Sequence, residues 1–360
     1  MGQIVLITGA AGLIGSHLCE AFAAAGHTVR AVELPGIECP EALAAGATVH
    51  AAQLDRPEGA LALAELAKGA SLLVHAAFPA VDDARVAVEL VRASCAAAVS
   101  AQAPLLLLSS CAVYGRPRNL PCDEGELKEP VDAQGLARWA AEHEAWLWRR
   151  TKGMKLVVLR PALSYGPRSR RGLGTALHVA ALAAHFGRSL LVPRRGPVVH
   201  AVHAVDVARA ALLVADSGIA AHDGRAFNVA DDVPLPLEEL SRALLQAVGA
   251  HEIGRLPWSR LTTQLVLWLL RKLPRWMVWG PLNRRLAQRW LDAFAGQPPM
   301  APPQIGPDLL EQLAADRYYD TQRLRALGYA PSVPSVIEGL RALAADSRAK
   351  KLLPAPHPTE

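Results

Sequence analysis

Short apolar runs alternate with alanine-rich stretches through the first half of the chain, and this alternation restricts the fold more than any other feature. Six runs have the length of one strand: QIVLIT, HTVRAVEL, ATVHAAQ, SLLVHAA, PLLLLSS and KLVVLRP. A strand that is apolar along its whole length needs cover on both faces, and helices between parallel strands provide that cover. The sequence therefore predicts an α/β fold with a doubly wound parallel sheet.

The segment TGAAGLIGSH places Gly9, Gly12 and Gly15 between the first predicted strand and the first helix. Glycines there let backbone N–H groups approach a pyrophosphate, while the positive end of the helix faces the phosphates. Glu33 ends the second strand about 18 residues later, close to the spacing of the acid that binds the adenosine ribose. A carboxylate at that place accepts hydrogen bonds from both ribose hydroxyls and repels a 2′-phosphate. The pattern predicts a Rossmann-type sheet that binds NAD in preference to NADP.

The pattern divides the chain into three parts. We expect an NAD-binding Rossmann domain over residues 1–165, and a smaller mixed substrate-binding lobe, interleaved with that domain, over residues 166–345. The proline-rich end predicts a flexible tail over residues 346–360.

Composition and motif spacing exclude several classes of function. The formal charge of +5 comes mostly from scattered arginines, so we expect no nucleic-acid partner. The five cysteines form no CxxC pair and no histidine cluster has metal-ligand spacing, which predicts no metal site. The first residues have no basic leader and meet glycines after a short apolar run, which predicts a buried strand and a cytoplasmic protein.

Residues 255–295 differ from the rest of the chain, because five tryptophans occur there among leucine, arginine and lysine: Trp258, Trp268, Trp276, Trp279 and Trp290. One interpretation is a helical pair that lines an apolar substrate pocket. Another is an amphipathic segment that makes a peripheral membrane contact, with tryptophan inward and basic residues outward. A spanning helix is the third, although the run LTTQLVLWLL has about half of the roughly 20 residues that a span needs.

Eight short blocks follow one another along nearly the whole chain: TGAAGLIG, Leu54-Asp55, HAAF from His75, SSCAVYG from Ser109, LRPALSYGP, HAVDVARA, FNVADD and YDTQRLRALGYAP. In content and order these blocks resemble the extended short-chain dehydrogenase/reductase family, the NAD-dependent epimerase/dehydratases. More loosely they resemble its 3β-hydroxysteroid dehydrogenase-like branch. In relatives with apolar substrates a tryptophan-bearing insert precedes the last block, as Leu256-Pro257-Trp258 does here, which favours a small apolar substrate.

The resemblance implies a set of cofactor contacts, in which Asp55 meets the adenine. The implied cofactor-binding residues are Gly9, Gly12, Leu13, Ile14, Gly15, Glu33, Asp55, Ala76, Ala77, Arg138 and Pro161.

The family's chemistry, as the resemblance implies it, uses a serine or threonine, a tyrosine and a lysine. Ser110 stands at the serine position. Glu142 matches a glutamate that follows the lysine by four residues, so counting back places Arg138 at the lysine and Gln134 at the tyrosine. No other register restores the pair, since no tyrosine lies between positions 114 and 165 and no lysine between 128 and 152.

The two replacements differ in severity. Arg138 keeps a cation that can hold ribose hydroxyls, whereas Gln134 has no proton to exchange and cannot act as a general acid or base. Tyr165 and His203 lie in segments that approach the substrate in relatives, and Tyr165 is our first candidate for the missing acid or base. Three other side chains are expected to pack in the interior or to face solvent: Cys111, Tyr114 and His143.

Two hypotheses from different classes follow. The first is a divergent NAD-dependent oxidoreductase or epimerase that acts on a small, apolar alcohol or ketone, with Ser110, Gln134, Arg138 and Tyr165 at its catalytic site. The second is an NAD-binding scaffold or ligand-binding protein with impaired catalysis. A non-redox enzyme that reuses the pocket is a third, and a homodimer through the helix of Gln134 is possible in each case.

Overall fold

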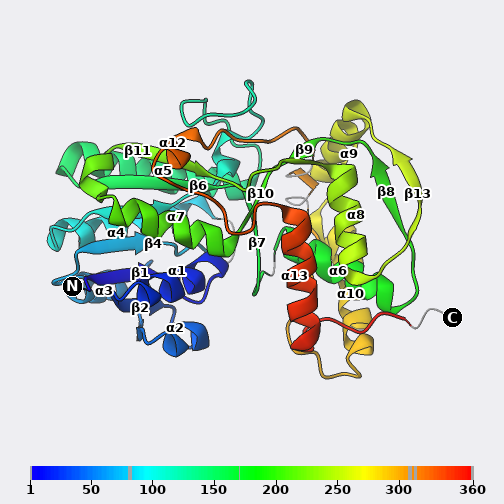
Figure 1. The fold of residues 1–360 in the computed structure, drawn as a ribbon, viewed down its shortest axis with the longest axis horizontal. Coiled ribbons are helices and arrows are strands. Elements are labelled where there is room, and N and C mark those ends of the chain that lie inside the picture. Colours follow the sequence, from blue (N-terminus) through cyan, green and yellow to red (C-terminus); the bar gives the residue numbers. More distant parts are fainter. Residues whose placement is uncertain (1, 80–82, 170, 307–309, 312–313, 358–360) are drawn as a thin grey trace. The chain divides into compact units, whose positions relative to one another are not determined.

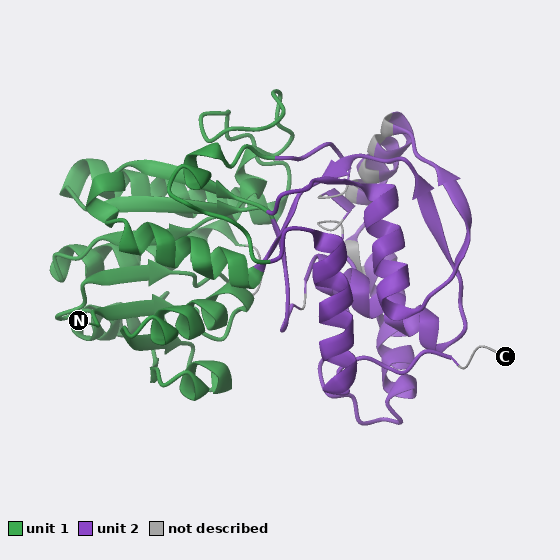
Figure 2. Cartoon of the chain, viewed as in Figure 1, with its two compact units in different colours: residues 1–162, 204–230, 319–332 green, residues 163–203, 231–318, 333–360 purple. Residues whose placement is uncertain are grey.

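The computed structural model describes residues 2–79, 83–169, 171–306, 310–311 and 314–357. For six residues of the tryptophan-rich segment only the backbone is described: Arg260, Gln264, Leu267, Arg271, Arg275 and Trp276. The chain forms two units (Figure 2). Unit 1 comprises residues 1–162, 204–230 and 319–332, and unit 2 comprises residues 163–203, 231–318 and 333–360.

A seven-stranded sheet forms the centre of unit 1, in the order β3–β2–β1–β4–β5–β6–β11 (Figure 1). Its strands are β1 (Ile4–Thr8), β2 (Thr28–Glu33), β3 (Thr48–Ala51), β4 (Leu72–His75), β5 (Leu105–Leu108), β6 (Leu156–Pro161) and β11 (Arg225–Val229). Every pair of neighbours is parallel. β4, β5 and β6 are buried at each residue, as strands covered on both faces must be. The predicted α/β, Rossmann-type doubly wound sheet is confirmed.

Helices cover this sheet, with α3, α4 and α5 packed in a row and α1 packed against α7. The helices of unit 1 are α1 (Leu13–Ala24), α2 (Pro40–Ala44), α3 (Pro57–Leu66), α4 (Ala84–Ser100), α5 (Ala133–Lys152), α7 (Ala204–Asp216) and α12 (Gln322–Arg325), with 3₁₀ turns η1 (Cys111–Tyr114) and η2 (Ile219–His222). Asp132 caps α5 by accepting a hydrogen bond from the Gly135 N–H at 2.6 Å. Gly153, at φ +67°, ends the same helix in the left-handed conformation.

The described part of unit 2 contains helices and three strand pairs. Its helices are α6 (Leu173–His185), α8 (Leu237–Val248), α9 (Arg260–Lys272), α10 (Arg275–Ala293) and α13 (Val336–Ala349). Its strand pairs are β7 (Leu163–Tyr165) with β10 (Ala201–His203), β9 (Val198–Val199) with β12 (Leu235–Pro236), and β8 (Leu190–Arg194) with β13 (Glu252–Pro257). α6, α8 and α13 share one apolar core.

The boundaries of the units differ from those expected from the sequence. Residues 204–230 and 319–332 belong to unit 1, because β11 extends the central sheet by pairing with β6. The predicted flexible tail begins inside a helix, since α13 continues to Ala349. Leu353, beyond that helix, is buried in the core of unit 2.

Candidate active site

The glycine-rich loop lies at the carboxyl end of β1, where the sheet order reverses between β1 and β4. The Gly9 N–H donates to the Val32 carbonyl oxygen at 2.9 Å, and Gly9 has φ +74°. A Cβ at Gly9 would lie 2.6 Å from the Ala77 Cα, and a Cβ at Gly15 would overlap the Gly9 carbonyl oxygen. Both positions therefore need glycine for close backbone approach. Carboxyl ends at such a reversal are where open α/β sheets bind ligands.

Gly12 differs from the other two glycines, because a Cβ there would be tight against one backbone atom but would not overlap it. It precedes the first residues of α1, Leu13 and Ile14, with φ −68° and no side-chain cap, and a Cβ there would find only the Gly9 carbonyl oxygen nearby, at 3.2 Å. No acidic side chain occupies the first turn of α1. The N–H groups of a first helical turn have no intrahelical acceptor and attract anions. The loop can therefore receive a pyrophosphate.

Glu33 ends β2 beside this loop. One carboxylate oxygen accepts a hydrogen bond from the Ala11 N–H at 2.9 Å, and the other accepts from the Leu34 N–H at 2.9 Å. Arg30 of the same strand is turned elsewhere, since it donates to the carbonyl oxygens of Leu66 and Lys68, both at 2.8 Å. The carboxylate is thus fixed at the loop, and the cation is held at the end of α3.

The remaining predicted cofactor residues follow other strands of the same sheet. Asp55 lies in the turn after β3, and Ala76 and Ala77 follow β4 against the Gly9 backbone. Pro161 is the last residue of β6. The structure therefore gathers the predicted nucleotide residues at one edge of one sheet.

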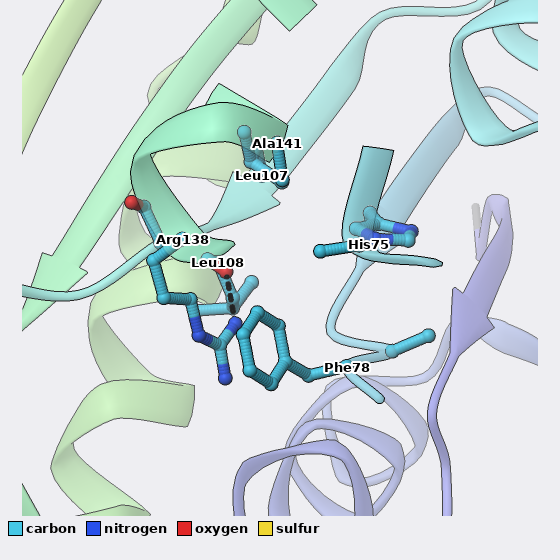
Figure 3. Close-up of a pocket in the computed structure, with 9 residues that line it drawn as sticks. His75, Phe78, Leu107, Leu108, Arg138 and Ala141 are labelled. Atoms are coloured by element: carbon cyan, nitrogen blue, oxygen red, sulfur yellow. Dashed lines mark hydrogen bonds between the residues drawn. The ribbon is translucent and has the colours of Figure 1, made fainter. Parts of the chain in front are cut away.

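Arg138 lies on α5 above the carboxyl end of β5 (Figure 3). Its guanidinium donates to the Leu108 carbonyl oxygen at 2.9 Å, and its carbon lies 3.6 Å from the centre of the Phe78 ring. These groups border a small cavity with room for about one water molecule, lined also by His75 and Ser109. The contact with Phe78 was not predicted from the sequence, although the aromatic residue stands in the HAAF block.

Gln134 and Ser110 are the two other predicted catalytic residues of unit 1. Gln134 is half-buried in the first turn of α5, one turn before Arg138, so both side chains leave the same face of the helix. Ser110 precedes η1, and its hydroxyl oxygen accepts a hydrogen bond from the Ala112 N–H at 3.1 Å. A hydroxyl that accepts in this way still has its proton to donate.

A buried charge network lies below this face. Glu142 and Arg160 form an ion pair in the interior, in which the Arg160 Nε donates to the carboxylate at 3.1 Å and the Ser109 hydroxyl donates at 2.6 Å. Burial alone would raise the pKa of Glu142, but the Arg160 guanidinium outweighs it, so the pKa lies below its usual value. The carboxylate is therefore charged and fully hydrogen-bonded, which anchors α5 to the sheet.

Tyr114 belongs to the same network. Its hydroxyl donates to the Asn228 side-chain oxygen at 2.7 Å and accepts from Arg160 at 2.8 Å. Burial raises the pKa of Tyr114 well above its usual range, so this tyrosine is no proton carrier near neutral pH. Cys111 next to it is buried, and burial likewise raises the pKa of its thiol well above its usual range. Both side chains pack in the interior, as expected, and His143 is exposed.

His75 closes the cavity from the strand side. Its Nδ1 lies 3.0 Å from the Thr8 hydroxyl oxygen and 2.8 Å from the Ser94 hydroxyl oxygen. Burial, assisted by the Arg138 charge, lowers the pKa of His75 to about 3. The imidazole is therefore neutral and holds β1, β4 and α4 together by hydrogen bonds.

Tyr165 and His203 lie in unit 2. Their rings meet edge to face with centres 5.2 Å apart, and Tyr165 is fully buried. The tyrosine ring packs on α13 at Gly339, where an added Cβ would lie 2.7 Å from the ring carbon that bears the hydroxyl. This packing counts against a role in proton transfer, because the hydroxyl lies in the apolar core of unit 2.

Unit 2 has an apolar pocket of its own, with a volume of about 220 Å³. It lies among α6, β8 and α8, and its lining is aliphatic apart from the hydroxyls of Thr175 and Ser241. Ile305 completes it, and none of the described side chains of residues 255–295 lines it. A cavity of about 150 Å³ is enough to hold benzene in other proteins. The pocket can therefore accept a short alkyl group.

The tryptophans of residues 255–295 differ in burial. Trp290 is buried, donates from its indole N–H to the Met300 carbonyl oxygen at 3.1 Å, and meets His178 edge to face. Trp279 is buried too, whereas Trp268 is exposed. The side chain of Trp276 lies outside the described residues. Only part of the segment thus faces solvent.

No group of three or more potential metal ligands occurs among the residues that the structure describes. Over the same residues, no helix is long and apolar enough to cross a membrane.

Comparison with known proteins places this geometry in context. Residues 5–230 match the model of the NAD dependent epimerase/dehydratase family. A 2-alkyl-3-oxoalkanoate reductase from Stenotrophomonas maltophilia is 28% identical over 362 residues, which cover 96% of this chain and 99% of that protein. A UDP-glucose 4-epimerase from Rhizobium meliloti is 29% identical over 168 residues, which cover 43% of this chain and 50% of that protein.

Among solved structures, UDP-glucose 4-epimerase from Thermotoga maritima superposes with a TM-score of 0.71 at 20% identity, over 97% of this chain and 99% of that one. A UDP-glucose 4-epimerase from Thermus thermophilus, solved as a complex with NAD, gives 0.68 at 21% identity over 96% and 99% of the two chains. Both likenesses show a common fold.

Proposed function

Because the chain belongs to the NAD dependent epimerase/dehydratase family, we propose that it is a divergent NAD-dependent oxidoreductase or epimerase, acting on a small, apolar ketone or alcohol. The observation that carries this proposal is the glycine loop with its fixed acid. Gly9 and Gly15 are held by backbone contacts that leave no room for a side chain, and Glu33 is bound to the same loop. Such a loop serves no evident purpose without a nucleotide.

NAD is the cofactor that these residues fit best. The backbone at Gly12 and the first turn of α1 would receive the pyrophosphate, and Glu33 would accept from the ribose hydroxyls. A 2′-phosphate would meet the carboxylate of Glu33, and Arg30, which could have neutralised it, is bound to the carbonyl oxygens of Leu66 and Lys68. Bound there, the cofactor would supply or accept a hydride.

Two observations support an alkyl-bearing ketone as substrate. The relative from Stenotrophomonas maltophilia, which matches over nearly the full chain, is named a 2-alkyl-3-oxoalkanoate reductase. Unit 2 offers an aliphatic pocket of about 220 Å³ with two hydroxyls. A nucleotide sugar fits this lining poorly, because a sugar needs many hydrogen-bond partners.

The residues of unit 1 suit a carbonyl substrate. The Ser110 hydroxyl can donate a hydrogen bond to the reacting oxygen, and the Gln134 amide can donate one to the same oxygen. The Arg138 charge stabilises an alkoxide as it forms, since a guanidinium stays protonated at any physiological pH. None of the three can release the proton that completes the reduction. Tyr165 remains our proposed source, in spite of its burial.

Turnover assays test the proposal. We expect NADH oxidation with 2-alkyl-3-oxo acids and a loss of about 10²- to 10⁴-fold in kcat for Tyr165→Phe. The control is Tyr318→Phe, a change of the same chemistry at a half-buried tyrosine of unit 2. Full activity of Tyr165→Phe would refute the role of Tyr165. If wild type binds NADH but shows no turnover, the proposal that the protein is an oxidoreductase is refuted.

The second candidate is an NAD-binding protein with little turnover. The specific observation in its favour is that Arg138 stacks on Phe78 and bonds to Leu108. A cation engaged in this way is less free to assist a tyrosine. Under this alternative, Gln134→Tyr combined with Arg138→Lys creates reductase activity that wild type lacks, and strong hydride transfer by wild type contradicts it.

A homodimer through α5 stays a prediction. Leu147 is exposed on that helix, and Trp139 and Trp146 are half-buried. The mass of the protein in solution, measured by light scattering for wild type and for Leu147→Glu, tests it.

A further inference from the structure

One face of α9 exposes large apolar side chains to solvent. Leu261 is 80% exposed and Trp268 is 55% exposed, and Leu265 and Leu269 are exposed beside them. Positions 261, 265, 268 and 269 follow the spacing of a single helical face. The opposite side of the helix is less exposed, at Thr263 and Leu270. α9 thus exposes large apolar side chains on the face where a surface helix usually has polar ones.

The exposed surface continues past the end of the helix, at Leu273 and Met277. We call these apolar residues the α9 surface; they are Leu261, Leu265, Val266, Trp268, Leu269, Leu273 and Met277. Soluble proteins rarely leave so many large apolar side chains together without a partner, and an exposed patch of this kind marks an interaction site.

The segment of the sequence that carries this surface has charge of one sign. From position 253 to position 291 the sequence has eight arginines and lysines and no acidic residue. The side chains of Lys272, Arg284, Arg285 and Arg289 are exposed. Within the described part of the chain, none of these four has a carboxylate at ion-pair distance. The Lys272 ammonium lies 5.8 Å from the centre of the Trp268 ring, so cation and apolar face adjoin.

The charge decides between two occupants of this surface. A second copy of the chain, placed on it by two-fold symmetry, would bring the same basic residues opposite themselves. An anionic bilayer surface complements both features at once, since it offers an acyl region to the apolar face and phosphate groups to the cations. α9 has 13 residues, about 20 Å of helix, so it can lie in the surface but cannot cross it.

We propose that the α9 surface docks on an anionic lipid bilayer, with Leu261, Leu265 and Trp268 in the interfacial layer. Lys272, Arg284 and Arg285 then bind the lipid headgroups. Docking of this kind is independent of the proposed activity, because it requires only side chains of α9 and α10. It corrects the expectation that the tryptophans as a group face the membrane: Trp268 does so, whereas Trp279 and Trp290 are buried.

Flotation of the full-length protein with vesicles tests the proposal. We expect binding to vesicles of phosphatidylcholine with about 30% phosphatidylglycerol, and weak binding to phosphatidylcholine alone or at high salt. Arg284→Gln with Arg285→Gln should weaken binding about 25-fold, at about fivefold for each charge. The matched control is Arg150→Gln with Lys152→Gln, which removes two exposed cations from unit 1.

The apolar part has its own variants. Leu261→Ser, Leu265→Ser and Trp268→Ser together should abolish flotation while leaving the circular dichroism spectrum unchanged, because these side chains pack on little else. Leu61→Ser, at a 70% exposed leucine of α3, is the control and should float as wild type does. The proposal is overturned if wild type fails to float. It is equally overturned if the triple variant turns a wild-type dimer into a monomer, which would identify a second copy as the partner.

Discussion

Two regions at the carboxyl edge of the central sheet differ in what defines them: backbone in one and side chains in the other. At β1 and β2 the nucleotide loop is defined by backbone: Gly9 and Gly15 have no space for a Cβ, and Glu33 is fixed by N–H groups. At β5 the site is defined by side chains on α5, and there Gln134 and Arg138 occupy the positions that we match to tyrosine and lysine.

The two regions differ in how well they tolerate substitution. A change at Gly9 or Gly15 forces backbone atoms apart, so the loop either keeps its glycines or loses its shape. A side chain on one face of a helix can be replaced without displacing backbone atoms, provided that the helix stays anchored. Glu142 and Arg160 supply that anchor below α5. The chemistry at α5 can therefore diverge while the fold around it is retained.

Loss of the buried ion pair between Glu142 and Arg160 should have the largest effect on stability. Glu142→Ala leaves the buried Arg160 without its partner, which should lower the free energy of unfolding by about 3–5 kcal/mol. Urea denaturation measures it. Glu89→Ala, which breaks an exposed ion pair of 2.7 Å with Arg92, is the control and should cost about 1 kcal/mol or less. Equal losses in the two variants would mean that α5 is held by other contacts.

The nucleotide end gives the next effect. Gly12→Arg places a long side chain at the start of α1, where an added Cβ would lie 3.2 Å from the Gly9 carbonyl oxygen, so a small shift of the loop should accommodate it while the phosphate site is filled. The affinity for NADH should fall about 100-fold or more, since two charge-assisted hydrogen bonds contribute about 1.5–3 kcal/mol each. NADH fluorescence titration measures it, and Ser100→Arg on the exposed end of α4 is the control. Unchanged affinity for NADH in Gly12→Arg would contradict the assignment of the glycine loop as the phosphate site.

The buried His75, which lies between these two regions, should make the stability of the protein depend on pH. Its pKa is about 3 in the folded protein and near 6.5 when unfolded, so the unfolded chain binds more protons between these values. Stability should therefore fall as pH falls below 6.5, by about 1.4 kcal/mol for each pH unit until pH 3. Urea denaturation of wild type and His75→Gln at pH 7, 6 and 5 measures the slope. The same slope in both proteins would contradict the assignment to His75.

The smallest effect concerns the stacked arginine. A double-mutant cycle with Arg138→Met and Phe78→Leu should give a coupling energy of about 0.5–2 kcal/mol in unfolding experiments. Additive effects would show that the guanidinium gains nothing from the ring. Arg138 could then leave the ring for a ligand without losing stability from that contact.

Much of unit 1 could be predicted from the sequence, because its signals are local. They are the alternation of apolar runs with helical stretches, the spacing of the glycines and the acidic residue at the end of the second strand. The six strands and the loop at Gly9 were found in this way. The seventh strand, β11, was recognised only as a strand end in FNVADD, since its partner β6 is about 70 residues away in the sequence. The contact of Arg138 with Phe78 was missed for a similar reason. It depends on how α5 packs beside the segment that follows β4, which no local pattern contains.

The catalytic face was harder to predict than the cofactor loop. Tyr165 was chosen because its block approaches the substrate in relatives, yet the structure places its ring on Gly339, 174 positions later. A proton carrier must be near its substrate, and sequence proximity to a motif does not report which way a ring turns.

The fit between Tyr165 and Gly339 restricts how this chain can change over generations. A methyl group at 339 overlaps the tyrosine hydroxyl, and removal of that hydroxyl still leaves the ring carbon 2.7 Å away. A phenylalanine at 165 therefore does not open the way to alanine at 339. The two positions can diverge only if the ring is lost first, so descendants that alter α13 at this point must already have given up the aromatic residue on β7.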